Sequence, residues 1–189
     1  VVRDAIRINL DELCFTEHVD YGVKPDWDQP SGARFEDGHP VTNCPYLAYL
    51  DELDRMRKRY GSQIGIARGL ELGVQTHTIP VYERLLERYG DRLDFTLLSI
   101  HQVGDCEFWN GAFQEGRTQE LLRVVEQFHG YSVVAHLDLI RRYDPTLGGP
   151  LPFSTVRDRD IVSQILSRVI ADGKGIEVNT SGWRYGLGA

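Results

Sequence analysis

Residues 95–101 have the sequence FTLLSIH, a short apolar stretch that ends on a histidine. Three other stretches share this form and also end on a residue that can bind a metal: LCFTEH at 13–18, IGIARGLE at 64–71 and VVAH at 133–136. Runs of this length that are rich in Val, Ile, Leu and Phe are typical of buried strands. We therefore predict four strands that each finish on a histidine or a glutamate.

The segments between these strands have the spacing of helices. Helices are predicted at 46–60, 80–90, 119–129 and 157–171, and a fifth strand at 175–179. Strands that alternate with helices indicate an α/β fold with a parallel sheet. The long polar stretch 20–45, rich in Pro and Gly, predicts a loop that covers a functional site. Because a barrel of the usual kind needs about eight strands, five strands form either an open sheet or part of a barrel.

Composition limits the classes of protein that this chain can belong to. With 189 residues, 41% hydrophobic and 26% charged, we expect one domain over residues 1–189. The net charge of -7 argues against a nucleic-acid partner, which needs a basic face, but allows a small phosphorylated metabolite beside a metal. Three cysteines without a CxxC pair suggest a cytoplasmic protein, and no apolar run predicts a membrane span. The oligomeric state stays open.

The strand ends suggest a shared metal site. The carboxyl ends of barrel strands converge on one face, so His18, Glu71, His101 and His136 are expected to lie together. A carboxylate at the end of a buried strand needs a partner, because burial of an unpaired charge is costly. Imidazole and carboxylate ligands together suit zinc, manganese or iron, and a carboxylate can bridge two ions.

Four tripeptides that contain these residues also follow one another in a familiar order. TEH at 16–18, GLE at 69–71, SIH at 99–101 and HLD at 136–138 resemble successive motifs of the polymerase-and-histidinol-phosphatase superfamily, called PHP. Longer stretches resemble its histidinol-phosphate phosphatase branch: LCFTEHVDY at 13–21, GLELG at 69–73, HLDLIRRY at 136–143 and EVNTSG at 177–182. The resemblance covers nearly the whole chain.

The resemblance implies a distorted TIM-like (β/α)7 barrel and a trinuclear metal site. It makes His18, Glu71, His101 and His136 metal ligands for two or three divalent ions. The family opens with a His-x-His motif and closes with an Asp-x-His motif near its end. No His-x-His occurs here and no such closing motif follows the fifth strand, so we expect an incomplete barrel that lacks its first and last strands.

Other residues are candidates for substrate contacts. A guanidinium binds phosphate through paired hydrogen bonds, and Arg141, Arg142 and Arg184 are the candidates by position. Asn179 ends its strand at the same face, and His77 follows Glu71 closely, so both are expected near the substrate. Two acidic side chains are candidates to orient a histidine or to take part in catalysis, Glu17 and Asp138.

These features predict a metal-dependent phosphatase that hydrolyses L-histidinol phosphate to L-histidinol and phosphate in histidine biosynthesis. Two alternatives stay open at this point. A PHP-type phosphoesterase for another substrate, such as a nucleotide, would keep the same metals. A non-catalytic PHP-like module would have lost part of the site.

Overall fold

The predicted parallel sheet is confirmed. The computed structural model describes residues 1–108, 117–139, 143 and 156–185. Its sheet has the order β1 (Glu12–Val19), β4 (Gly65–Gly73), β5 (Phe95–Ser99), β8 (Val133–Val134) and β9 (Gly175–Ile176). All neighbouring strands are parallel. Because each strand joins the sheet beside the preceding one, the order is that of a barrel wall and not of a doubly wound sheet.

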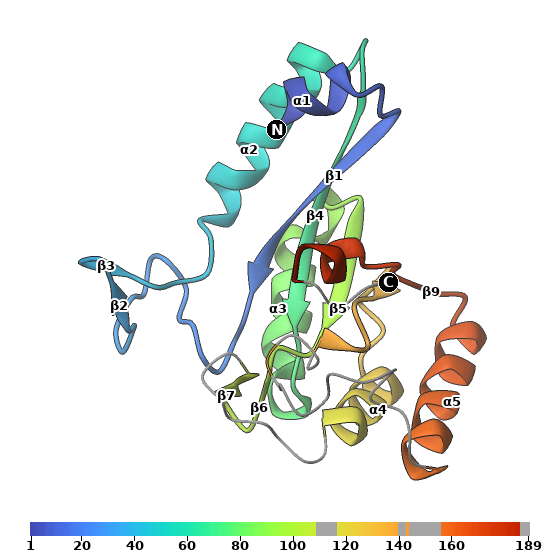
Figure 1. Cartoon of the computed structure of the whole chain (residues 1–189). Helices are drawn as coiled ribbons and strands as arrows, with labels where there is room; N and C mark the ends of the chain where they lie inside the picture. Colours follow the sequence, from blue (N-terminus) through green and yellow to red (C-terminus); the bar gives the residue numbers. More distant parts are fainter. Residues whose placement is uncertain (109–116, 140–142, 144–155, 186–189) are drawn as a thin grey trace.

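The helices follow the strands as predicted (Figure 1). They are α1 (Val2–Arg7), α2 (Tyr46–Tyr60), α3 (Ile79–Tyr89), α4 (Arg117–Gln127) and α5 (Val156–Ala171), with short 3-10 helices η1 (Thr76–Thr78), η2 (Gly90–Arg92) and η6 (Thr180–Tyr185). Helix α3 begins beside Pro80, which has no N–H to leave unsatisfied there, and turns Tyr82, Leu85 and Tyr89 inward. The spacing of apolar residues therefore located α2, α3, α4 and α5 to within about two residues.

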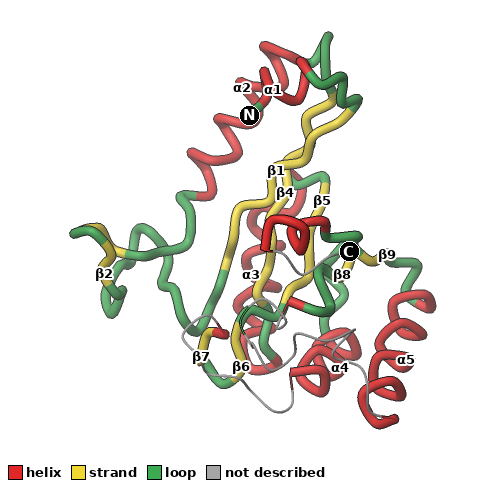
Figure 2. The backbone as a smooth tube through the Cα atoms, viewed as in Figure 1, coloured by secondary structure: helices red, strands yellow, loops and turns green. Residues whose placement is uncertain are grey.

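The apolar core lies between the sheet and its helices. Its largest cluster joins Leu70 and Leu98 of the strands to buried side chains of α3, α4 and α5, such as Tyr82, Val124 and Ile165. Strands β1 and β4 extend beyond β5 toward α1 (Figure 2). A second, small cluster forms there: Val2, Ala5, Ile64 and Ile66. The long strands thus connect two separate apolar regions.

Several boundaries differ from those predicted. Strand β1 runs on to Val19, and β5 and β8 end two residues before His101 and His136. The predicted loop 20–45 contains a hairpin, β2 (Phe35–Glu36) and β3 (His39–Pro40), because Asp37 and Gly38 both adopt the positive φ of a two-residue turn. A second hairpin, β6 (Gln102–Val103) and β7 (Cys106–Glu107), follows β5 directly. Short hairpins of this kind escape hydrophobic-pattern arguments.

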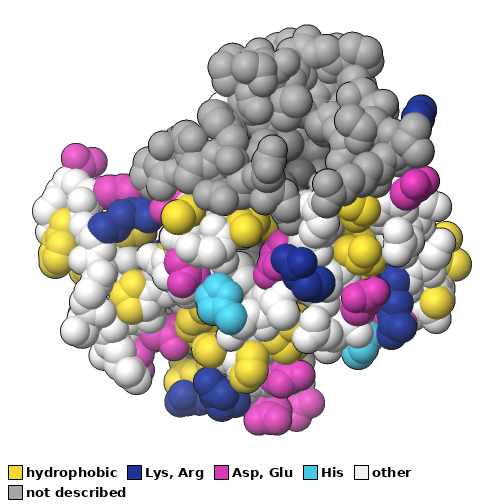
Figure 3. All heavy atoms as spheres, turned by 90° about the horizontal axis from the view of Figure 1, so that it is seen from below, with side chains coloured by type: hydrophobic (Ala, Val, Ile, Leu, Met, Phe, Trp, Pro, Cys, Tyr) yellow, Lys and Arg dark blue, Asp and Glu magenta, His cyan; other side chains and the backbone are white. Residues whose placement is uncertain are grey.

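The surface carries charges of both signs. On the face shown in Figure 3, Lys and Arg side chains lie beside Asp and Glu side chains and between apolar ones. Within the part of the chain that the structure describes, no helix combines the length and the apolar character that crossing a membrane requires.

Candidate metal centre

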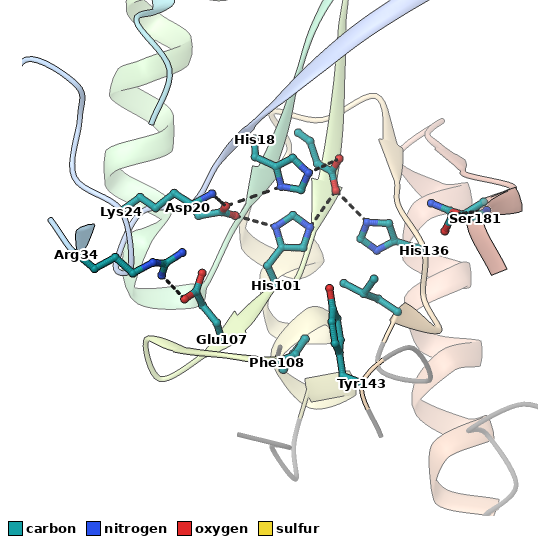
Figure 4. A pocket seen from close by; sticks show the side chains of 13 residues that line it. His18, Asp20, Lys24, Arg34, His101, Glu107, Phe108, His136, Tyr143 and Ser181 are labelled. Carbon is teal, nitrogen blue, oxygen red and sulfur yellow. Dashed lines mark hydrogen bonds and ion pairs between the residues drawn. The ribbon is translucent and has the colours of Figure 1, made fainter. Parts of the chain in front are cut away.

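The structure brings the four predicted ligands together at the carboxyl edge of the sheet. The register of β1 and β4 places His18 opposite Glu71. Glu71 Oε1 lies 2.9 Å from the Nε2 atoms of both His101 and His136, and its Oε2 lies 3.5 Å from His18 Nε2. Figure 4 shows the rings of His18, His101 and His136 close to one another. Ser99 Oγ also donates to Glu71 Oε1, at 2.9 Å, and so holds it in place.

A fifth residue, Asp20, joins this group although the sequence analysis did not select it. Its Oδ1 lies 2.7 Å from His101 Nδ1, and its side chain is almost fully buried. The backbone N–H of Asp20 donates to Asn43 Oδ1, which fixes the end of β1. Since alternate residues of a strand share a face, Asp20 lies on the same side as His18, two positions earlier. That spacing was the available signal. We refer to His18, Asp20, Glu71, His101 and His136 as the histidine–carboxylate cluster.

The expectation that Glu17 orients a histidine is wrong. Glu17 is exposed, and its backbone N–H donates to Tyr49 Oη. Because it precedes His18 in a strand, its side chain projects from the opposite face of the sheet. The carboxylate that supports His101 comes instead from Asp20.

The donor atoms of the cluster fit divalent cations. Two groups each place their ligand atoms within 4.8 Å of one another: His18 with Asp20 and His101, and Glu71 with His101 and His136. Ligand atoms about 2.1 Å from a shared ion lie roughly 3.0 to 3.4 Å apart in octahedral or tetrahedral sites. The separations of 2.9 and 3.5 Å between the Glu71 oxygens and the histidine nitrogens are close to these ligand–ligand distances. A mixture of imidazole and carboxylate suits zinc, manganese or iron.

Electrostatics show that the cluster attracts positive charge. Burial would raise the pKa of Glu71, but hydrogen bonds to His101 and His136 hold it well below its usual value. Burial likewise opposes ionisation of Asp20, yet His101 and Lys24 keep its pKa low. Burial would lower the pKa of His101, but Asp20 and Glu71 raise it to about 9. The protonated ring thus supplies, between two carboxylates, the positive charge that a metal ion would supply.

His18 behaves differently from His101. Burial lowers the pKa of His18, and the attraction of Glu71 only partly offsets this effect. His18 is also stacked on His101, with ring centroids 4.7 Å apart. Its imidazole is therefore neutral near pH 7 and keeps a nitrogen lone pair for a metal.

The cluster lies in the wall of a cavity of about 360 Å³. Two cationic side chains from the segment 20–45 line this cavity, Lys24 and Arg34. Lys24 Nζ donates to Asp20 Oδ2 at 2.7 Å, and Arg34 pairs with Glu107 at the end of β7. The predicted covering loop therefore contributes two cations beside the proposed metal positions.

The rest of the cavity wall has an apolar part and a polar part. Phe108, Leu139 and Tyr143 form an apolar part, and Asn179 and Ser181 form a polar part. Asn179 Oδ1 accepts the Ser181 N–H at 2.9 Å, which fixes the start of η6. The structure thus places Asn179 at the cavity, as predicted, although β9 ends at Ile176 and Asn179 does not end a strand.

Other predicted site residues lie elsewhere. Arg184 is exposed and lines a neighbouring hollow together with Asn179 and Ser181. Asp138 does not line the cavity. His77 is exposed and lies 3.0 Å, by its Nε2 atom, from Asp105 Oδ1. Arg141 and Arg142 lie outside the described residues.

A parallel barrel-type sheet with a histidine–carboxylate cluster at its carboxyl edge is the arrangement expected of a metal-dependent hydrolase. The chain matches the PHP domain family over residues 1–181, and it belongs to that family.

Named relatives make the comparison more specific. The chain is 29% identical to a histidinol-phosphatase of Lactococcus lactis subsp. lactis, over 95% of this chain and 64% of the relative. It is 25% identical to a histidinol-phosphatase of Bacillus subtilis, over 96% of this chain and 73% of the relative. The chain therefore spans less than two thirds of the length of the L. lactis relative.

Solved structures agree on the fold. The L. lactis histidinol phosphate phosphatase, complexed with zinc, L-histidinol and phosphate, superposes with a TM-score of 0.71 at 26% identity, over 95% of this chain and 65% of that chain. A structure from Listeria monocytogenes gives a TM-score of 0.73 at 18% identity, over 98% of this chain and 77% of that chain, and supports the fold alone. The neighbours are consistent with the predicted TIM-like barrel, whereas the expected additional strands stay a prediction.

Proposed function

We propose that this chain carries the active site of a metal-dependent phosphomonoesterase that hydrolyses L-histidinol phosphate to L-histidinol and phosphate. The observation that carries the proposal is the carboxylate of Glu71, which three histidines share at the carboxyl edge of the sheet. The histidinol-phosphatase relatives support the substrate, and the zinc in the L. lactis structure supports the metal.

The cluster is proposed to hold two or three divalent ions. His18, Glu71, His101 and His136 are the proposed ligands, and Asp20 is the further ligand that the geometry adds. Zinc, manganese and iron all suit this set of donors. When bound, such ions polarise a phosphoryl oxygen and lower the pKa of a water molecule toward neutrality.

The cationic side chains of the cavity are proposed to bind the phosphate. Lys24 Nζ and the Arg34 guanidinium both line the cavity, where each can donate charge-assisted hydrogen bonds to phosphate oxygens. Lys24 approaches from the side of Asp20, and Arg34 from the side of Glu107. Arg141 and Arg142 stay predictions for the same role, and Arg184 is a candidate for it from the neighbouring hollow.

The opposite wall is proposed to bind the alcohol part of the substrate. L-Histidinol carries a flat imidazole ring and an ammonium group. Phe108 and Tyr143 offer aromatic surface to the ring, and the amide of Asn179 offers polar contacts. His77 and Asp138 stay predictions for substrate contact and for catalysis, since neither lines the cavity.

The proposed substrate makes the partner a small phosphorylated metabolite and places the reaction in histidine biosynthesis. A cytoplasmic location and the absence of a nucleic-acid partner stay predictions. The oligomeric state stays open.

The test is phosphate release from histidinol phosphate by the protein with its natural termini. The assay is run with added zinc or manganese, with a chelator, and with a nucleoside monophosphate as the alternative substrate. We expect release from histidinol phosphate that the chelator abolishes. Faster release from the nucleotide would move the function to another PHP phosphoesterase, and no release by metal-loaded protein would leave a non-catalytic module.

A further inference from the structure

The turn of the β6–β7 hairpin is held by side chains from another segment. Gly104 and Asp105 form the turn with φ values of 58° and 60°, the left-handed region of a two-residue hairpin turn. Gln75 Nε2 donates to Asp105 Oδ1 at 2.7 Å, and the Asp105 N–H donates to Gln75 Oε1 at 3.0 Å. His77 Nε2 lies 3.0 Å from the same Asp105 oxygen. We call Gln75, His77 and Asp105 the turn clamp.

The clamp is anchored to the strand that carries the central carboxylate. Gln75 is almost fully buried and follows Glu71 by four residues, just after the end of β4. Its N–H donates to Thr78 Oγ1 at 2.9 Å, which fixes its backbone. Gly22, at φ 98°, packs so closely on Asp105 that a side chain there would collide with it. The clamp therefore lies where β4, the segment 20–45 and the hairpin meet.

The other end of the hairpin lies at the cavity. Strand β6 begins directly after His101, and the Phe108 N–H donates back to His101 O at 3.1 Å. Gln102 is buried and donates to Gly73 O at 2.8 Å. Glu107 therefore reaches the cavity wall, where it pairs with Arg34. The turn that Gln75 holds thus belongs to the same hairpin as Glu107, the partner of the Arg34 guanidinium at the cavity.

We infer that Gln75 and His77 act through Asp105 as positioning residues, which hold Glu107 and so aim Arg34 at the phosphate position of the cavity. This inference rests on the proposed function, because it assigns phosphate binding to Arg34. It also gives His77 a role at the turn in place of direct substrate contact. The hydrogen bonds that the structure describes for the clamp go to Thr78, to the Tyr21 carbonyl and within the clamp itself, and none goes to the histidine–carboxylate cluster. We therefore expect the clamp to act on phosphate binding and not on metal binding.

The test uses two variants of the metal-loaded protein, Gln75→Ala and Asp105→Gly. Asp105→Gly removes the carboxylate at a turn position where glycine adopts positive φ without strain. This variant is therefore expected to fold even if Gln75→Ala, which changes a buried side chain, does not. We expect each variant to raise the KM for histidinol phosphate and the Kd for inorganic phosphate roughly three- to tenfold, as the loss of one or two hydrogen bonds implies. The kcat and the bound metal per chain stay within about twofold of the wild type, since no group of the clamp reaches the metals.

Matched variants separate positioning from a merely structural role. Asp105→Asn keeps an Oδ1 acceptor for Gln75 and tolerates the left-handed backbone, so it restores wild-type KM and Kd. The double variant Gln75→Ala, Asp105→Gly loses less than the sum of the two single variants, because both remove the hydrogen bond from Gln75 Nε2 to Asp105 Oδ1. Unchanged phosphate affinity in both single variants, or a fall in kcat that follows loss of metal, overturns the inference.

The two readouts distinguish this inference from the proposed function. If the wild type binds phosphate but does not hydrolyse histidinol phosphate, the proposed substrate fails. The Kd for inorganic phosphate then tests the positioning role of the turn clamp by itself. Weaker phosphate binding in both variants supports that role. A wild type that does not bind phosphate at all overturns the inference as well.

Discussion

Strand β4 carries two polar networks, which differ in whether their charged groups are all paired with opposite charges. Arg68 belongs to an outer network of three arginines and three aspartates: Arg57, Arg68, Arg92, Asp51, Asp54 and Asp94. Glu71, three residues further on, belongs to the histidine–carboxylate cluster on the opposite face of the sheet. Every charge in the outer network meets an opposite one within 3.2 Å. The cluster instead offers several imidazole nitrogens to shared carboxylate oxygens.

This difference assigns the two faces different tasks. Arginine–aspartate pairs are complete without any addition, so the outer network contributes to stability. In the cluster, both ring nitrogens of His101 face carboxylate oxygens, so the ring must hold a second proton or give way to a cation. The outer network is therefore complete as folded, whereas the inner face holds groups of ligand atoms that could bind a metal ion.

The largest effect is expected from Glu71→Gln, which keeps the shape of the side chain and removes its charge. We expect phosphate release to fall by at least about 10³-fold, because the metals supply several kcal/mol of transition-state stabilisation. Bound metal, measured by elemental analysis, falls with it. The control Glu87→Gln neutralises an exposed glutamate of α3 and leaves both quantities unchanged. Wild-type activity in Glu71→Gln would show that the cluster is not the active site.

Metal removal should destabilise the protein only through the cluster. An ion present at about 100 times its Kd stabilises the folded state by roughly 2.7 kcal/mol, or about 5–10 °C in Tm for a chain of this size. We expect a chelator to lower the Tm of the wild type by that amount and to leave the Tm of Glu71→Gln unchanged. An equal shift in both proteins would place the stabilising ion elsewhere.

A substitution in the outer network is expected to have a smaller effect, which lowers stability and leaves activity and bound metal unchanged. The Arg68 side chain is 16% exposed, and Arg68→Met leaves Asp54 and Asp94 with one arginine each. We expect a loss of about 1 to 2 kcal/mol in the free energy of unfolding, measured by urea denaturation, with unchanged kcat and metal content. Arg55→Met serves as the control, because it removes an ion pair with Glu52 in which the Arg55 side chain is 66% exposed. Its expected loss in the free energy of unfolding is below about 0.5 kcal/mol. Loss of metal in Arg68→Met would contradict the division between the two faces.

The smallest expected signal is proton release when the metal binds. Asp20 and Glu71 raise the pKa of His101 to about 9 against the effect of burial, so at pH 7 the metal-free ring carries a proton that the metal must displace. Metal affinity should therefore rise with pH up to about 9, by at most tenfold per pH unit for one proton. Calorimetry in two buffers of different ionisation enthalpy measures the number of protons released. A value of zero at pH 7 contradicts the proposed displacement.

The sequence predicted the elements that depend on apolar periodicity. Strands β1, β4 and β5 were found as short apolar runs, and helices α2 and α3 by apolar residues at helical spacing. The ends of those runs then indicated His18, Glu71 and His101. The two hairpins were missed because each strand has only two residues, too few for a pattern. Their positions depend on turn residues such as Asp37 and Asp105, which adopt positive φ.

The candidate site was predicted only in part, because only some of its residues lie at the ends of strands that the apolar pattern reveals. Residues at the predicted strand ends could be placed together, although Asp20 was overlooked and Glu17 was wrongly expected to orient a histidine. Lys24 was missed together with Asp20, its partner four residues earlier. Arg34 could not be placed, because its position depends on a long-range contact of the segment 20–45 with Glu107. Such contacts have no signature in a single sequence.

The most direct test of the account is the position of zinc in a crystal of the zinc-loaded protein, measured by anomalous scattering at the zinc edge. We expect a peak bounded by Glu71, His101 and His136, where their ligand atoms lie within 4.8 Å of one another. Binding of zinc only elsewhere, for example at the exposed Cys106, or no bound zinc at all, would contradict it.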